Sequence, residues 1–304
     1  MATTKYYAHA IDLNGTYYSG VERSSMNGNT ERSVIHTDGQ VDPTNAALLS
    51  AAPALTVTTY NVAGLLAAVD FDGVAISSLT AFWKKGADCG TRASGSSHVK
   101  GVATSGCAVM RSLSASQGQR TTAEVEFFLN SSDGLTNPWT MSYSQALGGT
   151  LAEVTHYTMG PVFVTPSGGS RTQITASAWS LDPGIEVEQV ATDGNTYPTY
   201  TGINKRAPTG SITTPDIAHV STIPITGIVG SVEFFLRKIS ESTTSGRVSD
   251  AALEHIKITI ADAKITAETS EANTDGSGTA EIAIDATYDM SNAIVAIAFD
   301  QAIA

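Results

Sequence analysis

"VIHTDGQVDPTNAALLSAAPALTVTT" (residues 34–59) and "QVATDGNTYPTYTGINKRAPTGSITT" (residues 189–214) are two versions of one stretch, 155 positions apart. Nine residues, beginning with Thr-Asp-Gly and ending with Thr-Thr, are identical without a gap. Unrelated segments give far fewer matches, and these fall on residue types that shape the backbone. The match indicates an internal duplication, and its period is longer than the roughly 20 to 50 residues of solenoid repeats.

The correspondence continues beyond these two stretches. Three further pairs of segments align at offsets between 153 and 157: "SLTAFWKK" (78–85) with "SVEFFLRK" (231–238), "TAEV" (122–125) with "TAEI" (279–282), and "QAL" (145–147) with "QAI" (301–303). We therefore expect two domains, residues 1–147 and 148–304, and this division suits a chain of 304 residues.

The composition is that of a folded protein, with 41% hydrophobic and 15% charged residues. No apolar run approaches the roughly 18 residues that a membrane span requires, and the first residues do not resemble a signal peptide. We expect synthesis in a cytoplasm and no membrane insertion. The 17 basic and 29 acidic residues give a net charge of −12, which argues against tight binding to nucleic-acid backbones.

Two short helices are predicted in the first repeat. Asp42 as N-cap and Pro43 at the first helical position favour a helix over "TNAALLSAA" that ends before Pro53. A strand follows. Thr59 is then placed to cap a second helix with the apolar stripe Val62, Leu65, Leu66 and Val69, and Thr214 holds the same position in the second repeat.

The rest of the first repeat reads as β-structure. Alternating or β-branched positions mark strands over 74–85, 107–116, 122–130 and 138–146. The predicted fold class is therefore mainly β with short helices (α+β), arranged as two tandem, duplicated β-sandwich or partly open barrel domains.

The order of these segments resembles a known family. A helix ending in Ala-Pro, the Thr-rich strand "LTVTT" and the helix "NVAGLL" resemble the major tail (tail tube) proteins of long-tailed, siphovirus-type bacteriophages, in the variant with a duplicated tube domain. The resemblance implies a non-enzymatic virion protein, assembled in the host cytoplasm, without a cofactor. Three chains would form a ring of pseudo-sixfold symmetry, and stacked rings would form the conduit for genome delivery.

The resemblance also implies partners. These are other copies of the chain, the tail-tip and tail-terminator proteins, and the tape measure protein and double-stranded DNA, which pass through the lumen without tight binding.

One strand of each repeat carries carboxylates on a single face. Period-two alternation places Glu124 and Glu126 together in "EVEFFL", and Glu281 and Asp285 together in "EIAID". In a closed ring these residues would line an acidic lumen, along which DNA could slide. The equally weighted alternative is that they are ordinary solvent-facing residues of a sheet.

Two polar, partly basic loops are candidates for contacts between rings. Segment 84–101 carries Lys84, Lys85, Arg92 and Lys100, and segment 237–250 carries Arg237, Lys238 and Arg247. The resemblance implies that such a hairpin contacts the next ring, and a basic loop on an acidic neighbour would favour register. The alternative is a mobile solvent loop.

Other motifs do not develop into sites. "NTDGSGT" (273–279) imitates a calcium loop, but Ile284 stands where the bidentate Glu belongs, so no metal site is predicted. Cys89 and Cys107 would face each other if 84–112 formed one hairpin; two reduced thiols are favoured over a disulfide.

Two other functions stay open. A capsid decoration or adhesion protein would bind a receptor or glycan. A hydrolase could use Glu124 and Glu126, which share one strand face, but no catalytic signature accompanies them. An enzyme is therefore not expected.

Overall fold

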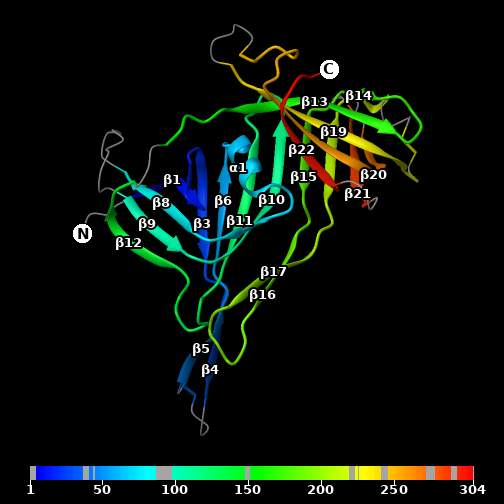
Figure 1. Cartoon of the computed structure of the whole chain (residues 1–304). Coiled ribbons are helices and arrows are strands. Elements are labelled where there is room, and N and C mark those ends of the chain that lie inside the picture. The colour runs from blue at the N-terminus through cyan, green and yellow to red at the C-terminus, as the bar shows by residue number, and fades with distance from the viewer. Residues whose placement is uncertain are drawn as a thin grey trace.

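Figure 1 shows a computed structural model of the whole chain, which is mainly β, with large antiparallel sheets and one short helix in the part described. The described residues are 5–36, 41–43, 45–86, 98–147, 151–218, 223–224, 226–240, 246–271, 278–288 and 293–303.

The largest sheet has thirteen strands, and eleven of them follow the order β14-β13-β19-β20-β21-β18-β15-β10-β11-β6-β3. These eleven are β14 (Thr172–Ile174), β13 (Tyr157–Pro166), β19 (Ile228–Lys238), β20 (His255–Glu271), β21 (Thr279–Ala286), β18 (Thr209–Thr214), β15 (Ala178–Asp182), β10 (Gly106–Ser116), β11 (Thr122–Leu129), β6 (Ala54–Thr59) and β3 (Val21–Asn27). Off this path, β7 (Val74–Ile76) pairs with β10, and β22 (Val295–Gln301) pairs with β20.

A second sheet and two hairpins complete the β-structure. The five-stranded sheet has the order β12 (Thr140–Gln145), β9 (His98–Ala103), β8 (Leu79–Lys85), β1 (Tyr6–Leu13) and β2 (Thr16–Tyr18). The hairpins are β4 (Thr30–Ile35) with β5 (Asn45–Ala51), and β16 (Glu186–Val190) with β17 (Tyr200–Lys205). Buried faces of both sheets share one hydrophobic core, which includes Leu55, Phe127, Trp179, Phe234 and Ile282.

The strands predicted over 107–116, 122–130 and 138–146 are confirmed, and so is the helix after Thr59, whereas 74–85 divides into β7 and β8, which lie in different sheets. That helix, α1 (Val62–Val69), buries the predicted stripe. Its N-cap is Asn61, whose Oδ1 accepts from Gly64 N at 3.3 Å, so the prediction of Thr59 as the cap was wrong. After Thr214 the structure describes a short turn at Ile217 and Ala218.

The helix predicted over "TNAALLSAA" is wrong, because Asn45–Ala51 form strand β5. This strand pairs with β4, from Thr30 opposite Ala51 to Ile35 opposite Asn45. The β-branched residues of β4 supply a pairing partner, and tertiary pairing outweighs the helix propensity of Ala and Leu.

Strand pairings recur between the two halves of the chain in the same register. Thr59 lies opposite Ala123 between β6 and β11, and Thr214 lies opposite Ala280 between β18 and β21. The β4–β5 hairpin has Arg32 opposite Leu48, and β16–β17 has Val187 opposite Ile203, each 155 residues later. Irregularities recur as well.

The β-bulges show this recurrence most directly. In the β10–β11 ladder the register shifts between Met110 and Ser112, and in the β20–β21 ladder it shifts between Ala267 and Thr269, 157 residues later. A bulge is a local feature that a regular ladder does not require. Its recurrence at equivalent residues indicates that these two ladders have the same register. The halves differ in one respect: β9 and β10 belong to different sheets, whereas the single strand β20 spans the corresponding residues.

Two buried threonines fix equivalent strand ends. Thr59 Oγ1 donates to Gly20 O at 3.0 Å and accepts from Asn61 N at 3.0 Å. Thr214 Oγ1 donates to Thr175 O at 2.6 Å and accepts from Asp216 N at 3.1 Å. Both hydroxyls are buried, and each uses its two hydrogen bonds to tie the strand end to neighbouring backbone.

Replacing either threonine by valine removes both hydrogen bonds at nearly constant volume. We expect Thr59→Val and Thr214→Val each to lower the free energy of unfolding by about 1–3 kcal/mol, measured by urea denaturation. Thr56→Val on the half-buried face of β6 is the control, and its stability should stay close to that of the natural chain. Equal stability of all three variants would contradict this role of the hydroxyls.

Candidate assembly surface

One face of the thirteen-stranded sheet is polar, and we call it the polar face. Register places the following strand residues on it: Lys264, Thr266, Glu281, Ala283, Asp285, Thr209, Ser211, Thr213, Ala178, Ser180, Asp182, Ser112, Ser114, Thr122, Glu124, Glu126, Thr56, Thr58, Arg23 and Ser25. Hydroxyl side chains dominate this set, and the opposite face carries core residues such as Leu113, Leu181 and Ile212.

The structure brings the four predicted carboxylates onto this same face. Glu124 and Glu126 project from β11, and Glu281 and Asp285 project from β21, four strands away in the sheet. Glu126 is paired with Arg111, whose Nε lies 2.7 Å from Glu126 Oε2. Glu124, Glu281 and Asp285 make no ion pair within the described part of the chain. Unpaired carboxylates therefore lie on this face in both halves of the chain.

The two halves of the chain meet at the β10–β15 ladder. Leu113 pairs with Leu181 and Ser114 with Ser180, so the sheet continues without a break across the junction. On the core side, Leu113 and Leu181 are fully buried. The junction leaves β3, which corresponds to β15, at the end of the sheet order. Residues 266–271 of β20, which correspond to part of β10, pair with β21 on one side only within the described chain.

The β16–β17 hairpin of the second half covers part of the polar face of the first half. Val187, Ile203 and Phe128 pack against a small apolar cluster of Cys107, Val109 and Ile185. Ile203 reaches over Gly73, where an added Cβ would lie 3.0 Å from Ile203 Cδ1. Burial raises the pKa of the Cys107 thiol, which keeps it protonated.

Polar contacts hold the same hairpin at its base. Arg111 Nη1 donates to Ile185 O at 2.6 Å, and its guanidinium lies 5.2 Å from the centre of the Phe128 ring. Arg206 donates to Asp72 Oδ1 at 2.6 Å and to Asp72 O at 2.8 Å. Both arginines therefore tie the second half to the first.

The repeated Thr-Asp-Gly motif lies at the tip of this hairpin, where Asp193 and Gly194 both have positive φ. Beyond the tip, Ser131 N donates to Pro198 O at 2.8 Å, and Tyr197 N donates to Gly134 O at 2.9 Å. The motif thus forms the turn, and the residues that follow it contact the first half. Of its first copy, residues 37–40 and Thr44 lie outside the described residues.

The first hairpin, β4–β5, extends away from the body of the molecule (Figure 1). Four apolar side chains on it are between 43% and 55% exposed: Val34, Ile35, Leu48 and Leu49. Exposed apolar groups clustered on one projecting element are typical of an interaction surface. This surface was not predicted from the sequence, because the residues of β5 were expected to form a helix.

The predicted loop cations lie in several environments. Lys84 and Lys85 end strand β8, whereas Arg92 and Cys89 lie outside the described residues. Lys100 was predicted in a loop, but it is a residue of strand β9 opposite Phe82. It belongs to a sheet because His98–Ala103 form strand β9, which was not predicted. Residues 84–112 do not form one hairpin, because β8 pairs with β9 and β10 lies in the other sheet, so the condition for Cys89 to face Cys107 is not met.

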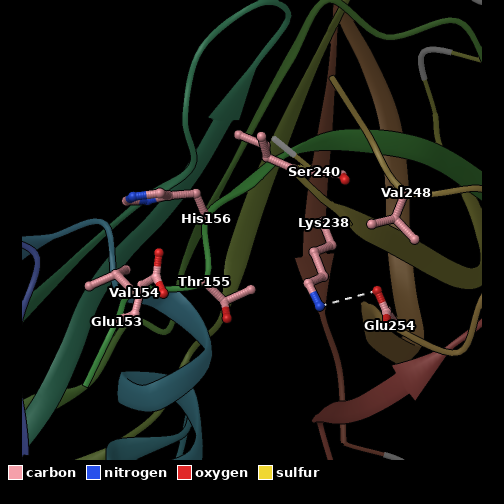
Figure 2. A pocket seen from close by; sticks show the side chains of 9 residues that line it. Glu153, Val154, Thr155, His156, Lys238, Ser240, Val248 and Glu254 are labelled. Atoms are coloured by element: carbon pink, nitrogen blue, oxygen red, sulfur yellow. Dashed lines mark ion pairs between the residues drawn. The ribbon is translucent and has the colours of Figure 1, made fainter. Parts of the chain in front are cut away.

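The second basic segment is largely neutralised. Arg237 Nη2 lies 2.8 Å from Asp250 Oδ1, and Lys238 Nζ lies 3.1 Å from Glu254 Oε2. Both cations end strand β19, and exposed Arg247 forms an isolated β-bridge with Ile239. Lys238 and Glu254 line an open cavity of about 470 Å³ together with Glu153 and His156 (Figure 2). No cluster of three metal-ligating side chains occurs in the described part of the chain.

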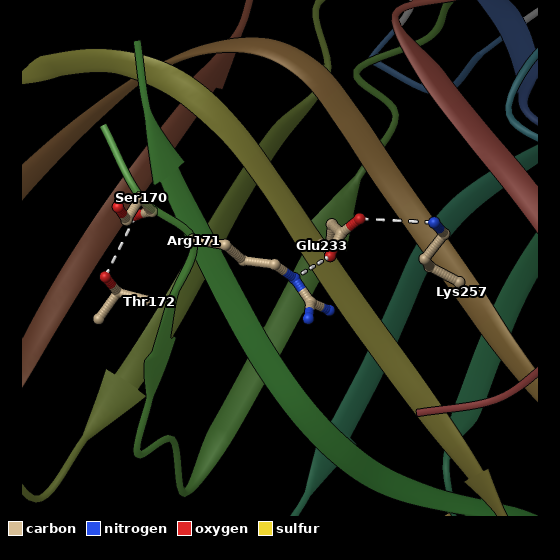
Figure 3. Close-up of polar contacts among 5 residues, drawn as sticks. All are labelled: Ser170, Arg171, Thr172, Glu233 and Lys257. Atoms are coloured by element: carbon tan, nitrogen blue, oxygen red, sulfur yellow. Dashed lines mark hydrogen bonds and ion pairs between the residues drawn. The ribbon is translucent and has the colours of Figure 1, made fainter. Parts of the chain in front are cut away.

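A network outside the junction is specific to the second half. Arg171 Nε contacts Glu233 Oε2 at 2.8 Å, and Lys257 Nζ lies 3.4 Å from Glu233 Oε1 (Figure 3). The Arg171 guanidinium also stacks 3.5 Å from the centre of the Phe163 ring. Lys257 occupies the position of Lys100 in the recurring register. This network stabilises the second half locally, because Arg171 and Lys257 are both paired with Glu233 within the chain.

A search against protein-family models found no match, and no curated protein matched the sequence. Among the described residues, no helix has the length and apolar character needed to cross a membrane. Functional inference therefore depends on the geometry of the sheet, its edges and its hairpins.

The turn that receives the hairpin tip depends on Asp133. Its Oδ1 accepts from Leu135 N at 2.9 Å and Thr136 N at 2.7 Å, and its Oδ2 accepts from Thr136 Oγ1 at 2.7 Å. Hydrogen bonds from Thr136, Leu135 and Ser131 hold the pKa of this carboxyl well below its usual range.

A depressed pKa means that Asp133 stabilises the fold fully above the unfolded pKa of about 4, and that this stabilisation is lost as pH falls toward the folded value. We expect Asp133→Asn to be less stable than the natural chain at pH 7. Urea midpoints should show the difference narrowing below about pH 4. A difference that is constant from pH 7 to pH 2.5 would contradict ionisation as the cause.

Proposed function

We propose that this chain is a structural subunit that closes into rings, and that the rings stack into the tail tube of a long-tailed bacteriophage. The observation that carries the proposal is the β10–β15 junction. It joins β20-β21-β18-β15 to β10-β11-β6-β3, two four-stranded units of the same register, in one continuous sheet. We infer that these units belong to two tandem, duplicated sandwich-like or partly open barrel domains.

The same junction supplies a rule for joining chains. Applying it once more places β3 of one chain beside β20 of the next. In that register Ser25 would lie opposite Glu271, as Ser180 lies opposite Ser114 within the chain. Repeating one operation with a constant rotation closes a ring, and it pairs the open edge of β3 with the open edge of residues 266–271 of β20. Three chains would contribute six units.

The polar face supports a conduit inside such a ring. It carries Glu124, Glu281 and Asp285 without ion-pair partners in the described chain, and many hydroxyl groups. Few cations on this face are free to neutralise phosphates, so DNA would find little to hold it. In this proposal Glu124 and Glu281 line the lumen, and Lys84, Lys85 and segment 237–250 contact the next ring.

The first test is electron microscopy of the purified chain at rising protein concentration, with rotational averaging of end views. We expect hollow stacks whose rings have sixfold-like inner density. Discrete particles at every concentration would instead favour the capsid decoration or adhesion function, which needs no axial stacking. If the natural chain hydrolyses a substrate and the Glu124→Gln variant does not, the hydrolase function is favoured instead.

Engineered cysteines test the edge pairing directly. Residues opposite each other on antiparallel strands have Cα atoms about 4.5–5.5 Å apart, within the roughly 4.4–6.8 Å that a disulfide spans. We expect oxidation of the Ser25→Cys/Glu271→Cys variant to link chains covalently. Denaturing gels should show species of two and three chains and none larger.

The matched control is Ser114→Cys/Ser180→Cys, the equivalent pair within one chain. It should form its disulfide at any protein concentration without changing the chain's mass. If the control pair oxidises but the Ser25 and Glu271 pair never links chains, β3 does not pair with β20, and the ring proposed here is wrong.

A further inference from the structure

The two hairpins have the same register but different surroundings. Val187 and Ile203 of β16–β17 are half-buried against the first half of the chain. Their counterparts in β4–β5, Arg32 and Leu48, are exposed, Leu48 to 44%. Within the described chain, therefore, one hairpin is docked and the other has no surface beneath it.

We propose that the β4–β5 hairpin of one chain docks on the polar face of the second half of another copy of this chain. Its seat would correspond to the seat of β16–β17 on the first half. The inference rests on the proposed ring and adds a contact to it that sheet-edge pairing does not require.

The order of elements makes both contacts compatible. In the second half β15 pairs with β10, and the next element, β16, begins the hairpin that covers the neighbouring face. In the first half β3 precedes β4 in the same way. If β3 pairs with β20 of another copy, the β4–β5 hairpin that follows β3 would lie above residues 264–266 and 285 of that copy.

The proposed seat on the second half has a glycine at the same position as the seat on the first half. Ile203 lies over Gly73, which has φ 79°, and the equivalent Gly227 has φ 80°. Leu48 would occupy the place of Ile203. The exposed Lys264 side chain now covers this spot, since its Cε would lie 3.0 Å from a Cβ at Gly227. A lysine stem of this kind moves aside at low cost, and packs along the incoming apolar side chain.

Charge complementarity replaces an apolar contact at the neighbouring position. Within the chain, Val187 and Phe128 belong to one apolar group. At the corresponding positions the hairpin carries Arg32 and the seat carries Asp285, both exposed. Glu268 replaces Arg111 beside them, so the seat has two carboxylates, Asp285 and Glu268, against the one cation Lys264. The apolar pair Val187 and Phe128 thus corresponds to Arg32 and Asp285, a pair of opposite charges.

A charge-reversal experiment tests the contact. Arg32→Glu and Asp285→Arg are each made in the full chain, and the concentration at which tubes form is measured by light scattering and electron microscopy. We expect each single variant to need roughly tenfold more protein than the natural chain, because like charges then meet in the interface. The double variant Arg32→Glu/Asp285→Arg should return to within about threefold of it, because the opposite charges are restored.

Glu153→Arg is the matched control, since it reverses an exposed charge away from both hairpins and should assemble like the natural chain. Urea midpoints show whether each variant is folded. Tubes that form equally well with both single reversals overturn the hairpin contact and leave the ring standing. Single variants that fail without rescue in the double variant also overturn it. A natural chain that never assembles overturns the proposed ring and this contact with it.

Discussion

The antiparallel hydrogen-bond ladder between β10 and β15 is the constraint on which the rest of the structure depends. It aligns Leu113 with Leu181 on the core side and Ser114 with Ser180 on the other side, so both halves share one buried and one polar face. Because a shift of one residue would exchange the two faces, this register fixes the whole sheet. It also brings β16–β17 over Cys107 and Val109.

Strand alternation and helical periodicity were sufficient to predict much of the molecule. The stripe from Val62 to Val69 gave α1, and the period of two placed Glu124 and Glu126 on one face, because side-chain direction in a strand follows from the backbone alone. The strand Asn45–Ala51 was missed because its composition suits a helix. Its aligned counterpart "YTGINKR" begins with β-branched, aromatic and Gly residues that disfavour a helix, and the two copies together indicate a hairpin.

The candidate surface was only partly predictable, for a physical reason. Which hairpin is covered depends on how the two halves of the chain pair. The local sequence near Leu48 or Ile203 does not indicate that pairing. The basic segments illustrate the same limit. Lys100 entered a strand, and the acidic partners of Arg237 and Lys238 are Asp250, at the end of the same segment, and Glu254, just beyond it. Composition showed the charges, whereas the fold determined which of them are neutralised.

The difference between the pairs Val187/Phe128 and Arg32/Asp285 has a consequence for the timing of assembly. The first pair meets at the high effective concentration that a covalent tether gives, so its apolar groups find each other during folding of a single chain. The second pair would meet only when separate chains collide, and ionic strength screens it. An apolar pair at that place would invite premature aggregation in a crowded cell. A charged pair makes growth reversible until neighbouring contacts have formed.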